Sequence, residues 1–482
     1  MILALLGAKY YGKRKFEMLK KDIGSHKMRL LKIAHIVMTW AMFYVCWIIF
    51  YKKDGTAMHA RFDFLMSVLY VVMIFILGRV YHMYEIGFSK VSELIYAQSL
   101  ATTISLCVIV VAHIFAFLWF PNPILPLVVL YIIQLCFNAL WCYFANKLYF
   151  ETYPPKKTIV LYRNDEDLSR LDEVSKFPRK FDVQEYLKCD FDDYRDLLKA
   201  IEPYDVVFAV GVSATLRNSI AKECIDTNKQ GYFVPHVGDI IMMGSRHVVQ
   251  FSVPVMNVGR AYLDPEYLVL KRAIDIVISI LGIIILSPLM TIVAIAIKAY
   301  DGGPVLYKQT RLTKDGKLFK IWKFRSMKVD AEQDGVARLA SEKDDRITPI
   351  GRVVRACRFD ELPQLFNILK GDMTIVGPRP ERPEIAAQYE EVLPSFRLRL
   401  QVKAGLTGTA QVYGKYNSTP YDKLEMDLLY IKNMSLFEDV KLMFATIRIL
   451  FLKDSTSGID EGQVTAVKDV EDIEPQNEMI EK

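Results

Sequence analysis

Four apolar segments constrain the fold of this chain more than any other feature of its sequence. They lie near residues 33–51, 62–83, 98–119 and 124–146. Each is close to the roughly 20 residues that a helix needs to cross a bilayer, and Tyr and Trp fall mostly near the segment ends, as in interfacial belts. The pattern predicts four transmembrane helices over residues 33–147. The alternative is a soluble bundle of buried helices.

Composition supports a membrane protein with folded domains. Of the 482 residues, 52% are hydrophobic, and this fraction excludes a wholly disordered chain. The clustering of the apolar residues excludes an ordinary soluble enzyme. A tail over residues 455–482 carries eight acidic and two basic residues and few large apolar ones. We expect this tail to be disordered.

Basic residues set the expected orientation of the helices. Residues 1–32 carry nine Lys and Arg, lysines also follow the fourth segment, and the loop at residues 120–123 is uncharged. Because the cytoplasmic ends of membrane helices are enriched in Lys and Arg, we expect a basic cytoplasmic N-terminus over residues 1–32. Both ends of the four-helix unit should then be cytoplasmic. Lys52, Lys53 and Arg61 in the first outer loop argue against this orientation.

Residues 157–250 have a different pattern. Residues 158–162 and 205–210 resemble buried strands separated by polar, helix-like stretches, which is typical of a small parallel α/β domain. Where a dinucleotide-binding fold would carry G-x-G-x-x-G, residues 163–167 read Arg-Asn-Asp-Glu-Asp. These acidic residues would repel a pyrophosphate. We therefore expect a structural or regulatory domain without a bound nucleotide.

A fifth apolar stretch over residues 273–297 is interrupted by Ser287 and Pro288. Its length would allow a straight spanning helix. Pro288 would bend the helix, however, and both flanks are basic, which suits a re-entrant helix whose two ends stay in the cytoplasm. Length and charge leave both possibilities open. Lys271 and Arg272 at its start are expected to face lipid headgroups.

Eight basic residues between positions 308 and 328 form a strip that is interleaved with aromatic residues. Such a strip can bind nucleic acid, but in a membrane-bound domain it suits anionic lipids and phosphorylated substrates better. We therefore expect no nucleic-acid partner, and we take Lys323 and Arg325 as candidate phosphate ligands. The alternative is a merely solvated basic face.

The adjacent carboxylates of Asp360 and Glu361 are the candidate catalytic residues. Residues 248–482 contain no histidine, so a carboxylate pair is the natural choice there. Pro363 places the pair at or just before a helix N-terminus, where a carboxylate stays ionised. An ionised carboxylate can act as a nucleophile or hold Mg²⁺ together with substrate phosphates. Helix capping is the alternative role.

A single arginine, Arg379, stands between Pro378 and Pro380. The prolines restrict the local backbone. A guanidinium held in this way suits bidentate capture of a diphosphate.

Several segments in order resemble the catalytic domain of the bacterial polyprenyl-phosphate glycosyl-1-phosphate transferases, the bacterial sugar transferase family. They are Lys271-Arg272, Ser287-Pro288 and residues 307–311, 319–327, 360–364 and 377–380. The whole chain is similar to the large members of this family, such as the undecaprenyl-phosphate galactose and glucose phosphotransferases. One departure lies at residues 403–412, where many relatives have Pro at the position of Ala404 and Leu-Trp at the positions of Thr409-Ala410. This difference leaves the identity of the sugar open.

The resemblance implies an α-helical membrane protein plus α/β domains. It implies four transmembrane helices, a degenerate Rossmann-like domain over residues 157–250, and a monotopic catalytic domain over residues 266–454. A re-entrant, Ser-Pro-broken helix over residues 273–297 would anchor that domain on the cytoplasmic face of the bacterial inner membrane.

The resemblance also implies the chemistry. Asp360 would be the nucleophile of an Asp-Glu pair with Glu361, both residues would bind Mg²⁺, and Arg379 would bind substrate phosphate. A hexose-1-phosphate would pass from a UDP-sugar to undecaprenyl phosphate, with UMP released, at the start of exopolysaccharide, capsule or O-antigen synthesis. A homodimer is possible.

Two other classes of function remain open. The chain could be a scaffold or regulator of polysaccharide assembly without catalysis. It could also be a direct glycosyltransferase, which would release UDP in place of UMP.

Overall fold

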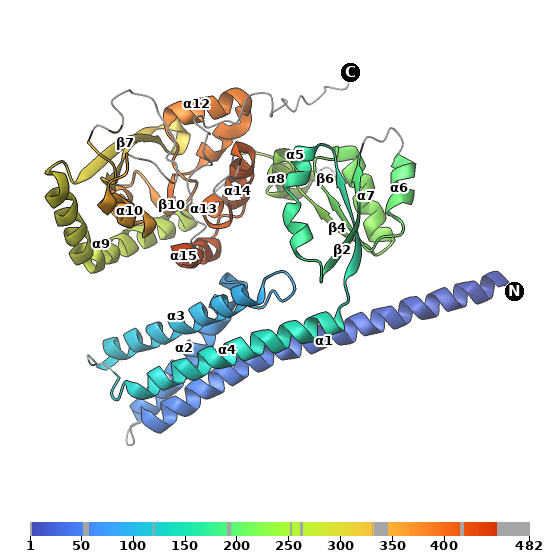
Figure 1. Cartoon of the computed structure of the whole chain (residues 1–482), viewed down its shortest axis with the longest axis horizontal. Helices are drawn as coiled ribbons and strands as arrows, with labels where there is room; N and C mark the ends of the chain where they lie inside the picture. Colours follow the sequence, from blue (N-terminus) through green and yellow to red (C-terminus); the bar gives the residue numbers. More distant parts are fainter. Residues whose placement is uncertain are drawn as a thin grey trace. The chain divides into compact units, whose positions relative to one another are not determined.

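The computed structural model describes residues 2–51, 57–117, 119, 121–189, 194–250, 253–260, 264–329, 331, 346–414 and 419–450. The predicted tail at 455–482 and the basic Lys52 and Lys53 lie outside the described residues. The chain divides into two compact units, Met1–Val234 and Pro235–Lys482, and many of their elements are labelled in Figure 1.

The first unit begins with four long helices that pack as neighbours in a bundle. They are α1 (Ile2–Phe50), α2 (Ala57–Val80), α3 (Val91–Phe117) and α4 (Leu125–Thr152). Each contains one of the four predicted apolar segments, and α1 also includes nearly all of the basic N-terminal region as one continuous helix. Large apolar side chains point outward, such as Phe115 with 80% exposure. An exposed apolar surface of this kind belongs in lipid.

Polar side chains lie inside this bundle. His35 Nε2 is 3.1 Å from Asn138 Oδ1, and Asn138 Nδ2 donates to Thr102 Oγ1 at 3.1 Å. Tyr70 Oη donates to Gln134 Oε1 at 3.0 Å. Interhelical hydrogen bonds of this kind hold helices together where lipid removes the hydrophobic driving force. The bundle is therefore apolar outside and partly polar inside, as a membrane bundle is.

A parallel four-stranded sheet completes the first unit. Its strand order is β2-β1-β3-β4, and all its neighbouring strands are parallel. The strands are β1 (Lys156–Tyr162), β2 (Phe181–Lys188), β3 (Val206–Ala209) and β4 (Gln230–Phe233). The connecting helices are α5 (Asp165–Ser169), the 3-10 helix η1 (Asp172–Lys176), α6 (Tyr194–Ile201) and α7 (Ala214–Asp226). The two predicted strands are confirmed as β1 and β3, which are buried on both faces as in doubly covered parallel sheets.

An acidic side chain lies at the carboxyl edge of this sheet. Gly211, just after β3, has a φ of +67°, and a Cβ built on it would lie 1.9 Å from Asp167 Oδ2. Doubly wound sheets bind ligands at this edge, where the strand order reverses. Asp167 is one of the acidic residues predicted to disfavour a pyrophosphate there.

The second unit is built mainly of helices around two small strand pairs and a hairpin. Its helices are α8 (Val237–Met243), α9 (Pro265–Asp301), α10 (Pro349–Ala356), α11 (Gln364–Lys370), α12 (Pro383–Val392), α13 (Thr409–Tyr413), α14 (Pro420–Lys432) and α15 (Leu436–Leu450). The 3-10 helices are η2 (Lys314–Gly316), η3 (Phe359–Glu361) and η4 (Pro394–Gln401). Strands β5 (Arg246–Gln250) and β6 (Val253–Asn257) are antiparallel, as are β7 (Leu306–Leu312) and β8 (Leu318–Phe324), whereas β9 (Thr374–Val376) and β10 (Gly405–Thr407) are parallel.

The boundary between the units differs from the predicted one. We expected the α/β domain to extend to residue 250, but residues from Pro235 onward belong to the second unit. Ile240 of α8 is buried in the core of that unit together with Leu424 and Leu428 of α14. The backbone N–H of Val237 also donates to Tyr421 Oη at 3.4 Å. Apolar packing against α14 therefore removes α8 from the sheet domain.

Helix α9 continues through Pro288 and is longer than the predicted 273–297. Figure 1 shows it as two arms that meet at a bend. Ser287 Oγ donates to the carbonyl of Ile284 at 2.9 Å, which is the local hydrogen bonding that makes a proline tolerable in a membrane helix. With α1 to α4, α9 is one of five helices among the described residues that are long and apolar enough to cross a membrane.

Candidate active site

The carboxylate pair lies in a short 3-10 turn between two helices. Asp360 and Glu361 belong to η3, and Pro363 is the N-cap of α11, which confirms the predicted helix start. Phe359 and Leu362 on either side of the pair pack against a buried cluster that includes Phe324 of β8. The apolar neighbours therefore anchor the turn and leave the carboxylates to face the charged groups around them.

Two cations from distant segments meet at this pair. Lys323 Nζ, from β8, lies 3.1 Å from Glu361 Oε1 and 3.8 Å from Asp360 Oδ2. Arg379 Nη2, from the loop after β9, lies 3.1 Å from the same Glu361 oxygen. The structure thus brings together four of the predicted site residues. Glu361 is shared between both cations, whereas Lys323 lies farther from Asp360.

The surroundings separate the acidities of the two carboxyl groups. Both side chains are only 13% exposed. Burial raises the pKa of Asp360, and the charge of Glu361 raises it further, although Lys323 opposes both effects. Burial would also raise the pKa of Glu361, but the charges of Lys323 and Arg379 outweigh it and hold that pKa well below its usual range. The pair is therefore asymmetric, with Glu361 as the fixed anion.

The loop that carries Arg379 is held by its backbone. The N–H of Gly377 donates to the carbonyl of Thr407 at 2.8 Å, and the N–H of Gly405 donates to the carbonyl of Pro378 at 2.9 Å. A Cβ on Gly405 would lie 2.1 Å from Gly377 N, so this approach requires glycine. The Arg379 side chain is 42% exposed and remains accessible to an anionic ligand.

A second set of charged residues supports this loop and was not predicted from the sequence. Arg399 Nη2 donates to the carbonyl of Arg379 at 2.9 Å, and its Nε donates to Asp427 Oδ2 at 2.8 Å. Arg311 Nη1 donates to the carbonyl of Pro380 at 3.0 Å. Arg399 and Asp427 are almost fully buried. No short motif links the two residues, so only the tertiary structure reveals their role.

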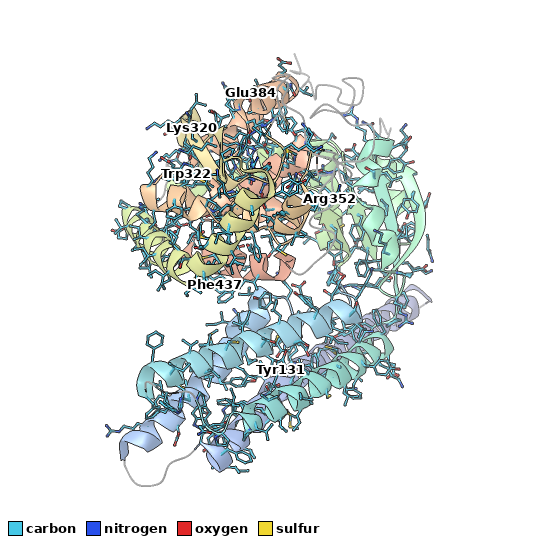
Figure 2. All side chains as sticks on the ribbon, turned by 60° about the vertical axis from the view of Figure 1, so that its left-hand side comes forward. Tyr131, Lys320, Trp322, Arg352, Glu384 and Phe437 are labelled. Carbon is cyan, nitrogen blue, oxygen red and sulfur yellow. The ribbon has the colours of Figure 1, made fainter. Side chains whose placement is uncertain are left out.

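The basic strip divides between the two strands of the β7–β8 hairpin and the residues around it. Lys323 reaches the carboxylate pair, and Lys308 Nζ lies 4.7 Å from the ring centroid of Trp322, which is labelled in Figure 2. Five of the eight basic side chains are exposed, namely Lys308, Lys314, Lys317, Lys320 and Lys328. These five remain available to an anionic surface.

Three of the predicted site residues, Arg325, Lys271 and Arg272, have partners within the protein. Arg325, a candidate phosphate ligand, is paired through both terminal nitrogens with Asp301 at the end of α9. Lys271, expected to face headgroups, is only 8% exposed, and its Nζ lies 2.7 Å from Asp439 Oδ2. Arg272 donates to the carbonyls of Ile368 and Leu369. All three cations have intramolecular partners because burial makes an unpaired charge costly.

A small pocket lies next to the loop that carries Arg379. Its lining includes Arg379, Thr313, Glu381, Phe396 and Ala404. The N–H of Ala404 donates to Thr313 Oγ1 at 3.2 Å, a hydrogen bond that proline could not make. The position at which this sequence departs from many relatives therefore borders the site.

The donor set is compatible with Mg²⁺ but not with a protein-enclosed metal. Among the described residues, no group of three or more His, Cys, Asp or Glu side chains could hold an ion. Asp360 and Glu361 offer two adjacent carboxylates, and Mg²⁺ is commonly held by one or two carboxylates together with substrate phosphates.

The chain is similar to a family of known proteins. Residues 266–453 match the family described as bacterial sugar transferase. The chain is 36% identical over 242 residues to a UDP-glucose:undecaprenyl-phosphate glucose-1-phosphate transferase of Klebsiella pneumoniae. The aligned segment covers 49% of this chain and 52% of that protein. It is 30% identical over 351 residues to an undecaprenyl-phosphate galactose phosphotransferase of Salmonella typhimurium, covering 66% of this chain and 72% of the relative.

A shorter relative is matched over nearly its whole length. An exopolysaccharide production protein PSS of Rhizobium leguminosarum bv. phaseoli is 41% identical over 189 residues, which are 37% of this chain and 94% of that protein. The chain spans about half the length of the Klebsiella relative. The family match includes the carboxylate pair, Lys323 and Arg379, and the Salmonella relative extends the similarity over most of both chains. The chain therefore belongs to the bacterial sugar transferase family.

Proposed function

We propose that this chain transfers a hexose-1-phosphate from a UDP-sugar to undecaprenyl phosphate. The products are undecaprenyl-diphosphate-sugar and UMP, and the reaction starts the synthesis of an exopolysaccharide, capsule or O-antigen. The observation that carries the proposal is the asymmetric carboxylate pair between Lys323 and Arg379. The names of the Klebsiella and Salmonella relatives supply the substrate class.

The first step belongs to Asp360. An oxygen of its carboxylate attacks the β-phosphorus of the UDP-sugar, a new oxygen–phosphorus bond forms, and the bond to the α-phosphate breaks with release of UMP. The enzyme then carries the sugar phosphate as an acyl phosphate. Asp360 suits this role because its carboxylate has no contact shorter than the 3.8 Å to Lys323 among its described ion pairs.

The second step restores the enzyme. An oxygen of the lipid phosphate attacks the same phosphorus, the diphosphate bond of the product forms, and the acyl phosphate bond breaks to regenerate the Asp360 carboxylate. Glu361 stays ionised throughout and holds Lys323 and Arg379 in place. Both steps depend mainly on positioning and on neutralisation of phosphate charge.

Asp360 and Glu361 would also hold Mg²⁺ when it is bound, and the ion would neutralise charge on the diphosphate. Arg379 supplies a cation of the protein for the same purpose. Its planar guanidinium, partly exposed beside the pair, can donate to two phosphate oxygens at once.

The proposed location is the cytoplasmic face of the bacterial inner membrane, with α1 to α4 spanning and α9 re-entrant. Contacts at both ends of α9 support the re-entrant form. Near its start Asp275 accepts from Thr374 and Ile375, and near its end Val293 and Ile297 pack with Phe324 and Val354. A helix whose two ends both bind the same folded unit keeps both ends on the side of the bilayer where that unit lies.

Release of UMP tests the proposed function. The purified chain should release UMP from at least one UDP-sugar when undecaprenyl phosphate is present, and a panel of UDP-sugars would identify the sugar. Release of UDP would select the direct glycosyltransferase. Absence of both products with every donor would favour the scaffold.

We also propose that the chain forms a homodimer through residues 157–250. Light scattering of the purified chain tests it. A monomeric mass at micromolar concentration would contradict it.

A further inference from the structure

Helix α9 makes polar contacts with the segment that carries the active site. Arg272 Nη1 donates to the carbonyl of Ile368 at 2.6 Å, and Nη2 donates to the carbonyl of Leu369 at 2.7 Å. One turn further along, Asp275 Oδ2 accepts from Thr374 Oγ1 at 2.8 Å and Oδ1 accepts from the N–H of Ile375 at 3.0 Å. Four hydrogen bonds therefore join two side chains of α9 to residues 368–375.

These contacts lie midway between the two halves of the site. Ile368 and Leu369 are in the last turn of α11, which starts just after Asp360 and Glu361. Thr374 and Ile375 are in β9, which leads into the loop of Arg379. The chain from residue 360 to residue 379 thus carries the carboxylate pair at one end, the arginine at the other, and the α9 contacts between them.

The geometry of these contacts is suited to fixing the position of residues 368–375 relative to α9. The carbonyl of Ile368 already accepts from the N–H of Gly371 at 3.0 Å, and the planar guanidinium of Arg272 adds a second donor to it and one to the carbonyl of Leu369 at a defined angle. Asp275 is buried, and each of its oxygens accepts a hydrogen bond. Helix α11 has only seven residues and spans roughly 10 Å, so a shift at its end displaces the carboxylate pair at its start.

We propose that Arg272 and Asp275 are positioning residues that set the distance between the Asp360–Glu361 pair and Arg379. Helix α9 then has two roles: it anchors the domain in the membrane, and it holds the active-site residues at the correct distance from one another. This inference rests on the proposed function, because its readout is UMP release.

The test uses matched variants of the full chain in nanodiscs. Arg272→Lys keeps the positive charge but loses the planar guanidinium with its two donors. Arg272→Met loses the charge and the donors. Asp275→Asn can keep both hydrogen bonds, because the Thr374 hydroxyl can accept as well as donate, whereas Asp275→Leu loses both. Lys298→Met is the control, since Lys298 lies near the other end of α9 and donates to the carbonyl of Gly302 at 2.5 Å.

The measured quantity is the first-order rate constant of UMP release in a single turnover at saturating UDP-sugar. This constant does not depend on the fraction of folded enzyme. We expect a fall of about 10- to 100-fold for Arg272→Met and Asp275→Leu, as for a small misplacement of reacting groups. Arg272→Lys should fall less, and Asp275→Asn and Lys298→Met should stay within about twofold of the unaltered chain. The KM for the UDP-sugar should change little.

A purely structural role gives a different pattern. It would lower the yield or the midpoint of thermal unfolding and leave the rate constant unchanged, and that result would overturn the positioning role. If Arg272→Met does not fold, the rate constants of Arg272→Lys, Asp275→Asn and Asp275→Leu distinguish the two roles by the same criterion. UMP release by the unaltered chain with normal rate constants in the variants would overturn only this inference. No UMP from the unaltered chain would overturn the proposed function with it.

Discussion

Asp360 and Glu361 are neighbours in sequence but differ in what surrounds them. Glu361 Oε1 accepts from both Lys323 and Arg379, whereas burial and the adjacent anion raise the pKa of Asp360. A nucleophile must be ionised and unencumbered, and a charge anchor must stay ionised at all working pH values. The two positions match these two roles.

This asymmetry predicts a pH dependence. Attack by Asp360 requires the ionised form, so the single-turnover rate should fall as pH decreases through the pKa of Asp360, which lies above the ordinary value for aspartate. Lys323 lowers this pKa and Glu361 raises it. The acid limb should therefore move to higher pH in Lys323→Met and to lower pH in Glu361→Gln. A rate profile for each variant checks the prediction, and shifts of the same sign in both would refute it.

Arg379 should act on the donor phosphates. Removal of a charge-assisted hydrogen bond costs about 1.5–3 kcal/mol, so Arg379→Ala should lower kcat/KM for the UDP-sugar by roughly 10- to 100-fold. Arg379→Lys should recover only part of this loss because it keeps the charge without the fork. Steady-state kinetics of both variants provide the measurement. Unchanged kinetics in Arg379→Ala would remove its phosphate role.

Single residues also show where sequence reasoning reaches its limit. Asp360, Glu361, Lys323 and Arg379 were predicted together, and the structure brings them together. Arg325 stands two positions from Lys323 but pairs with Asp301. In a strand, residues two apart share a face, so the pattern alone gave no reason to separate them. The two side chains differ in the carboxylate that the fold places near each of them, Glu361 for Lys323 and Asp301 for Arg325.

At the scale of elements, α9 combines two kinds of surface. Lys271, Asp275 and Ser279 are buried against the second unit, whereas Ile285 near the bend is 71% exposed. The apolar run identified a membrane segment from sequence. The polar residues on the buried side of α9 contact Asp439 and β9, which lie 100 or more residues away in sequence. The local sequence of α9 therefore does not predict this buried side or the full length of the helix.

The re-entrant arrangement predicts that both ends of α9 are accessible from the same side of the membrane. Glu266→Cys and Tyr300→Cys would place thiols on its two exposed ends. The three exposed native cysteines, Cys107, Cys136 and Cys357, should first be replaced by serine. An impermeant maleimide should label both new thiols only in inside-out vesicles. Labelling from opposite sides would show that α9 spans the bilayer.

Strands illustrate the same limit at this scale. β1 and β3 were predictable because they are continuous apolar runs in the middle of the sheet. β2 is an edge strand with mostly exposed or half-buried residues, Phe181–Lys188. Its polar sequence does not distinguish it from a helix or a loop.

The whole molecule consists of two units, and the site lies in only one. Asp360, Glu361, Lys323 and Arg379 all belong to Pro235–Lys482, which has its own core. The Rhizobium relative matches 189 residues of this chain over 94% of its own length. The sequence predicted a membrane bundle, a sheet domain and a catalytic domain. The predicted sheet domain extends to residue 250, whereas α8 packs against α14 in the second unit, a contact between segments far apart in sequence.

A fragment of residues 235–482 should therefore retain catalysis. Expressed in membranes, it should release UMP at a rate within about tenfold of the full chain, since every residue of the site and α9 are present. The fragment with Asp360→Asn is the control. A folded, membrane-bound fragment without activity would mean that the first unit contributes to the reaction.

The covalent intermediate on Asp360 is the most direct test of the account. The full chain would be mixed with a UDP-sugar that supports turnover, quenched rapidly and analysed by peptide mass spectrometry. We predict a phosphohexose adduct on the peptide that contains Asp360, formed together with UMP and absent in Asp360→Asn. UMP release without this adduct, or an adduct on another residue, would contradict the account.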